Sequence, residues 1–169
     1  REAEGSLSDV DWLQTKLYAV GLKSLYLNVA GREGQGSVTA EEIEPLLADV
    51  QKKLLEWVGP DGRPVVQRVR LKHEVYKGPY SRLGPDLVVG YASGYRASGE
   101  TGLGKVPDVL MESNTDHWGA DHCMDSDVVP GVIFANRELE DFGTISFRDI
   151  PFLAIGKHLD QSNNKPPAQ

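Results

Sequence analysis

The stretch Asp86-Leu-Val-Val-Gly-Tyr91 decides the fold class, because it is one of the two longest apolar runs in the chain. A short run of strand-forming residues without alternation predicts a strand that is buried on both faces, as in a parallel sheet covered by helices. The second run, Pro130-Gly-Val-Ile-Phe-Ala-Asn136, has the same character and predicts another buried strand. Both runs are far too short to span a bilayer as a helix.

Around the first run, the sequence predicts two strands and one long helix. Residues 24–29 and 65–72 alternate in character, and each range predicts a strand. Thr39 followed by Glu42 is a capping box, which predicts the start of a helix. Apolar residues then recur at helical spacing and predict a core-facing stripe. They are Ile43, Leu46, Leu47, Val50, Leu54, Trp57 and Val58.

The remaining segments complete one α/β domain over residues 9–158. Residues 9–20 predict a short helix or an irregular segment, and residues 146–158 predict a helix. Residues 93–109 are rich in Gly and small polar residues and predict a long loop. The ends, residues 1–8 and 159–169, are polar and are expected to be frayed or disordered.

Composition narrows the possible functions. The formal net charge is −7 and no Lys/Arg cluster is present, which argues against a nucleic-acid partner. The N-terminus has no signal-peptide pattern, and neither this nor the single Cys123 determines the compartment. We therefore expect no membrane insertion within this chain and leave its localisation open.

The stretch from Asn114 to Asp125 carries the densest group of chemically active side chains. It contains two histidines and three aspartates, which are ligands for zinc, manganese or iron and common acid/base groups. His117 and Asp116 fit either a local metal pair or a solvated loop, and the loop is the preferred interpretation. Asp125 and Asp127 are typical of caps or turns. Cys123 follows His122 directly, and adjacent side chains on an extended segment diverge, so a Cys–His nucleophile is not expected.

Several motifs, taken in order, resemble the C-terminal part of the type I phosphodiesterase/nucleotide pyrophosphatase group of the alkaline phosphatase superfamily. The resemblance covers about residues 9–157. It is carried by Tyr18-Ala-Val-Gly-Leu, Leu25-Tyr-Leu-Asn-Val-Ala-Gly-Arg-Glu33, Gly78-Pro-Tyr, Pro85-Asp-Leu-Val-Val-Gly-Tyr91, Gly94-Tyr-Arg96, Trp118-Gly-Ala-Asp-His122, Pro130-Gly-Val-Ile-Phe-Ala-Asn-Arg137 and Asp149-Ile-Pro-Phe-Leu.

The resemblance implies a hydrolase that cleaves a phosphate ester or a pyrophosphate bond of a nucleotide-like small molecule. In that group a Thr or Ser nucleophile and two divalent metals, usually zinc with manganese as an alternative, act at the edge of a parallel sheet. His122 matches the last metal-binding histidine of the group. Asp121 is then a neighbour that orients or tunes it. Trp118 either covers the metal site or packs in the core, and Arg96 either faces a substrate phosphate or is a surface arginine.

The chain departs from the group because the nucleophile, the first ligands and the Asp-His-Gly signature are not in it. We therefore expect the C-terminal portion of an incomplete alkaline-phosphatase-like domain, whose partner is the missing N-terminal part and which is inactive alone. Two alternatives stay open. One is a non-catalytic binding or assembly module on the same scaffold, and the other is a mononuclear metal site of His117, Asp121 and His122.

Overall fold

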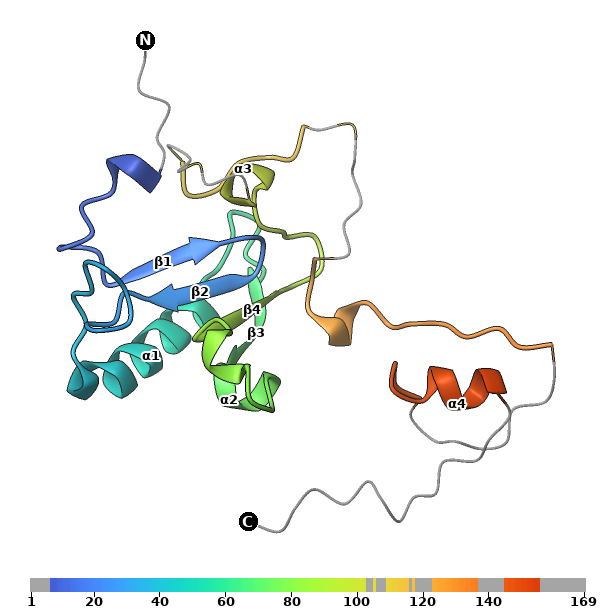
Figure 1. The fold of residues 1–169 in the computed structure, drawn as a ribbon. Coiled ribbons are helices and arrows are strands. Elements are labelled where there is room, and N and C mark those ends of the chain that lie inside the picture. Colours follow the sequence, from blue (N-terminus) through green and yellow to red (C-terminus); the bar gives the residue numbers. More distant parts are fainter. Residues whose placement is uncertain are drawn as a thin grey trace. The chain divides into compact units, whose positions relative to one another are not determined.

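A computed structural model describes residues 7–102, 105, 109–115, 117, 123–136 and 145–155 of the chain (Figure 1). The chain divides into two compact units, Arg1–Pro130 and Gly131–Gln169, which are described one at a time. The expected tail, residues 159–169, lies outside the described residues, as do residues 1–6 of the N-terminal segment. Residues 7 and 8 of that segment belong to the 3-10 helix η1 (Leu7–Asp9).

The first unit contains a four-stranded sheet in the order β1-β2-β4-β3. Its strands are β1 (Leu17–Val20), β2 (Ser24–Leu27), β3 (Val66–Leu71) and β4 (Leu87–Tyr91). Every neighbouring pair is antiparallel. The expected mixed α/β character is confirmed, as are the strands at 24–29, 65–72 and 86–91. The expected parallel pairing of 86–91 is wrong. Residues 9–20 were expected to form a short helix or an irregular segment; residues 10–16 are irregular, whereas residues 17–20 form β1.

The helix α1 (Ala40–Leu55) begins where the capping box predicts. The backbone N–H of Thr39 donates to Glu42 Oε2 at 3.0 Å, which satisfies a donor that the first helical turn leaves free. Figure 1 shows α1 lying along the sheet, and α1 contacts β3. The helix and the sheet therefore form two layers around one core.

The core lies between these two layers. It is built on buried side chains of β3, β4 and the residue before β3. Half-buried apolar side chains of α1, and of the segment directly after it, cover this core. The buried members are Val65, Val66, Val69, Leu87 and Val89, and the covering residues include Leu47, Val50, Leu54 and Trp57. The expected apolar stripe is thus confirmed for these four, whereas Val58 is 56% exposed and does not belong to the core.

Short elements occupy the connections of the first unit. They are α2 (Lys72–Val75), the 3-10 helix η2 (Ser81–Leu83), α3 (Gly99–Gly102) and the 3-10 helix η3 (Ser126–Val128). The long loop expected over residues 93–109 therefore includes one short helix. No helix among the described residues is long and apolar enough to cross a membrane.

The second unit differs from its expected structure. Residues 131–136 are described and are not a strand, and Val132 and Phe134 are 83% and 92% exposed. The predicted buried strand at 130–136 is therefore wrong. An apolar run forms a strand only when it pairs in a ladder, and the sheet of the described residues does not include it. The helix predicted over 146–158 is present as α4 (Ile150–Ile155), and residues 156–158 lie outside the described part.

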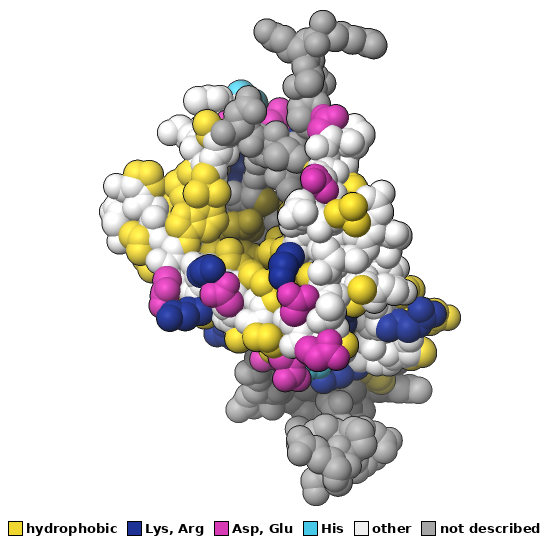
Figure 2. Space-filling view, turned by 90° about the vertical axis from the view of Figure 1, so that its left-hand side faces the viewer, with side chains coloured by type: hydrophobic (Ala, Val, Ile, Leu, Met, Phe, Trp, Pro, Cys, Tyr) yellow, Lys and Arg dark blue, Asp and Glu magenta, His cyan; other side chains and the backbone are white. Residues whose placement is uncertain are grey.

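Figure 2 shows one face of the molecule, on which acidic and basic side chains lie interspersed. Neither sign forms a continuous stripe there, and hydrophobic side chains gather in the upper part of the same face.

Candidate functional site

The segment that directly follows His122 in the sequence is fixed to the end of β4. Met124 pairs with Tyr91 in a parallel bridge, and the N–H of Asp125 donates to the Tyr91 carbonyl at 2.9 Å. Lys23 Nζ donates to the Met124 carbonyl at 2.7 Å. Backbone and side-chain bonds therefore hold this segment against the sheet.

The side chain of Asp125 also fixes this segment. It is 1% exposed and forms an ion pair with Arg70 of β3, while its Oδ1 accepts the N–H of Asp127 at 3.0 Å. Burial alone would raise the pKa of Asp125, but the hydrogen bonds from Arg70 and Asp127 outweigh it and hold the pKa below its usual value. The expected turn or cap role of Asp125 is confirmed, since it caps η3. Its ion pair with Arg70 was not predicted.

Gly90 lets the anchored segment approach β4. A Cβ at this position would overlap the carboxylate of Asp125. Gly90 also lies on the same face as Arg70, because Arg70 pairs with Val88 and side chains alternate along a strand. Only glycine leaves room for a carboxylate to lie directly on the strand.

The residues predicted for a metal site are mostly outside the described part of the chain. His122, Asp121 and Trp118 lie there, as does Asp116. Arg96 is described and half-buried, in the segment after β4, and His117 is described and exposed. Among the described residues no group of three or more His, Cys, Asp or Glu side chains is placed to hold a metal ion. The described residues by themselves therefore do not fit a metal centre.

A second polar cluster lies at the other end of β4, around Asp86, which sequence reasoning missed as a site. Asp86 is 9% exposed, and its carboxylate accepts the Leu27 N–H at 2.8 Å, Arg32 Nη2 at 2.6 Å and Lys72 Nζ at 2.7 Å. Burial would raise the pKa of Asp86, but the hydrogen bonds from Arg32 and Lys72 prevail and lower it. The only sequence signal for this cluster is an acidic residue placed directly before an apolar strand.

Asn28 and Arg32 hold the turn after β2. Asn28 Nδ2 donates to the Gln35 carbonyl at 2.9 Å, and Arg32 Nη2 donates to the Leu27 carbonyl at 2.6 Å. The loop at residues 31–36 is therefore a structural turn.

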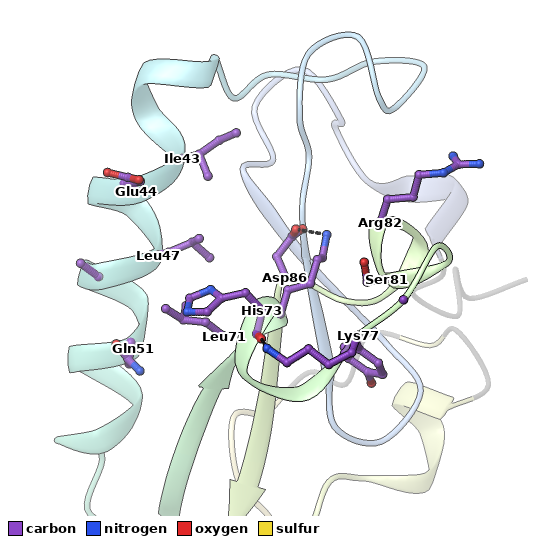
Figure 3. A pocket seen from close by; sticks show the side chains of 14 residues that line it. Ile43, Glu44, Leu47, Gln51, Leu71, His73, Lys77, Ser81, Arg82 and Asp86 are labelled. Atoms are coloured by element: carbon purple, nitrogen blue, oxygen red, sulfur yellow. Dashed lines mark hydrogen bonds and ion pairs between the residues drawn. The ribbon is translucent and has the colours of Figure 1, made fainter. Parts of the chain in front are cut away.

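A cavity of about 800 Å³ opens beside the Asp86 cluster, between α1 and the segment that runs through α2 and η2 (Figure 3). Its α1 wall carries apolar side chains together with Glu44 and Gln51, and the wall at α2 and η2 carries basic side chains. Its lining includes Ile43, Glu44, Leu47, Leu71, Lys72, His73, Tyr76, Lys77 and Arg82. The cavity lies near the first residue of β4, whereas the segment after His122 is fixed at the last.

Comparison with known proteins identifies no relative. No family model, no curated protein and no solved structure matches the chain. Function is therefore argued from the chemistry and placement of the residues themselves.

Proposed function

We propose that this chain is the C-terminal portion of a metal-dependent hydrolase of phosphate esters or pyrophosphate bonds, in which His122 binds one of two divalent metals. The observation that carries the proposal is the position of Trp118-Gly-Ala-Asp-His122 directly before the segment that Asp125 and Met124 fix to β4. A metal ligand must be held close to one geometry, which a neighbouring rigid element supports.

The proposal assigns most of the remaining metal ligands and the Thr or Ser nucleophile to the N-terminal part of the enzyme, upstream of this chain. Zinc or manganese bound there would polarise the phosphate ester and stabilise charge on its oxygens. A catalytic zinc takes about three protein ligands. His122 alone is therefore insufficient, and the parallel sheet of an alkaline-phosphatase-like domain would also lie outside the four antiparallel strands.

Three further residues have roles in this proposal. Asp121 is a neighbour that orients or tunes His122 without binding the metal itself. Arg96 binds phosphate oxygens of the substrate with its planar guanidinium. Trp118 shields the site from water or packs beneath it.

The test compares His122→Ala with His158→Ala in a longer protein that contains this segment. Loss of a metal-binding side chain removes several kcal/mol of stabilisation of the charged transition state. Turnover of a p-nitrophenyl phosphodiester should therefore fall at least about 100-fold. Metal analysis should show fewer than two ions per chain in His122→Ala and an unchanged content in His158→Ala.

Three results would overturn the proposal. The first is unchanged metal content and turnover in His122→Ala. The second is a longer protein without metal or turnover, which would favour a binding or assembly module. The third is one zinc retained by the 169-residue chain and lost in His117→Ala, which would favour a mononuclear site.

A further inference from the structure

We infer that the cavity between α1 and α2 binds a small amphipathic anion, with an aromatic or short aliphatic body and one acidic head group. This site is independent of the metal chemistry proposed for His122, because the cavity lies near the first residue of β4, whereas Met124, two residues after His122 in the sequence, pairs with the last. A volume of about 800 Å³ falls within the range of small-molecule sites.

The apolar wall provides a surface for the body of the ligand. Ile43 and Leu47 of α1 and Leu71 of β3 line it, and all three are half-buried. Figure 3 shows Ile43 and Leu47 extending from α1 toward the cavity. Apolar area removed from water here contributes about 25 cal/mol per Å² to binding.

Basic side chains on the other wall would attract the head group. Three cationic side chains, Lys72, Lys77 and Arg82, line the cavity against two carboxylates, so its lining keeps one net positive charge. Lys77 Nζ donates to the His73 carbonyl at 2.6 Å, which holds its ammonium at the cavity. This concentration of cations in a chain of net charge −7 favours an anion at this place.

Arg82 adds a further cation at the edge of the cavity. It is exposed and, within the described part of the chain, makes no ion pair. Its guanidinium can therefore turn toward a bound anion without breaking an ion pair to a described residue. A planar guanidinium also matches the two oxygens of a carboxylate.

Glu44 disfavours an acidic head group beside α1. It is among the lining residues on α1, and Figure 3 draws its exposed side chain on the side of the helix away from Lys77 and Arg82. Like charges repel, so the acidic head is directed away from α1 and toward the 77–82 segment. The apolar body then lies against Leu47.

The experiment titrates the full 169-residue chain with 8-anilinonaphthalene-1-sulfonate and follows its fluorescence, with octanoate as competitor. Exposed charge contacts each contribute modestly, so Lys77→Ala/Arg82→Ala should weaken binding about fivefold. Glu44→Gln should tighten binding about twofold. Ala48→Trp fills the cavity from an exposed position of α1 and should abolish binding that octanoate displaces.

The matched control is Lys52→Ala/Lys53→Ala, which removes two lysines of α1 that do not line the cavity. It should bind the probe as the original chain does, and circular dichroism should show all variants folded. The inference is overturned if folded Ala48→Trp still binds, if the control weakens binding as much as Lys77→Ala/Arg82→Ala, or if no probe binds.

Discussion

At the residue scale, two arginines of β3 show how burial decides the strength of an ion pair. Arg70 pairs with Asp125, whose side chain is 0% exposed, whereas Arg68 pairs with Asp127, whose side chain is 48% exposed. A buried carboxylate that loses its cation keeps the full cost of lost hydration. An exposed carboxylate is rehydrated by water.

We therefore predict different costs for two substitutions on the same strand. Arg70→Leu should lower the free energy of unfolding by about 3 kcal/mol, because it leaves Asp125 buried and uncompensated. Arg68→Leu should lower it by less than about 1 kcal/mol. Urea unfolding followed by circular dichroism measures both, and equal costs would contradict the burial argument.

At the element scale, β4 is covered on both faces, but not by helices above and below a parallel sheet as its sequence predicted. The core covers Leu87 and Val89 on one face, and the segment carrying Asp125 covers Gly90 on the other. The apolar sequence of β4 therefore predicts that both of its faces are buried. It does not predict whether the neighbouring strands are parallel or antiparallel.

Gly90→Ala tests this arrangement. The added methyl group meets the Asp125 carboxylate, so the segment must move, and we expect a loss of about 2 kcal/mol in stability. Gly34→Ala is the matched control, since a Cβ there meets no atom within 4 Å. Its stability should change by less than about 1 kcal/mol. Similar losses in the two variants, measured by thermal unfolding, would show that Asp125 does not lie on the strand.

At the scale of the whole molecule, acidic groups with lowered pKa values link stability to pH. The pKa values of Asp86 and Asp125 lie below their usual value in the folded chain, because Arg32, Lys72 and Arg70 stabilise the carboxylates against the opposing effect of burial. Their contribution is fully present above the unfolded pKa of about 3.9 and is lost as pH falls through the lower folded values. Burial raises the pKa of Tyr91, whose contribution is lost instead as pH rises through its folded value, above about 10.

The free energy of unfolding should therefore fall steeply below about pH 4 and again above about pH 10. Urea unfolding at pH 3, 4, 5, 7 and 9 measures the acid limb and the plateau. Asp125→Asn, which no longer titrates at this position, should flatten the acid limb. An original chain equally stable at pH 3 and pH 7 would contradict the prediction.

The sequence by itself determined the local structure of this protein. The capping box of Thr39 and Glu42 fixed the start of α1, and the apolar residues of 65–72 and 86–91 fixed two strands, because these signals act within a few residues. The motif ending at His122 is a sequence feature, and its metal binding stays a prediction.

Only the tertiary structure decided which strands pair, in which direction, and which charges meet. Apolar residues 130–136 have the composition of a strand but are exposed, because a strand also requires a partner that supplies hydrogen bonds. Arg70 and Asp125 are 55 residues apart, and Arg32 and Asp86 are 54 apart. Such pairs depend on how the sheet folds back on itself, and no local pattern encodes that distance. The cavity beside Asp86 depends on the same folding, because α1 and α2 form its walls together.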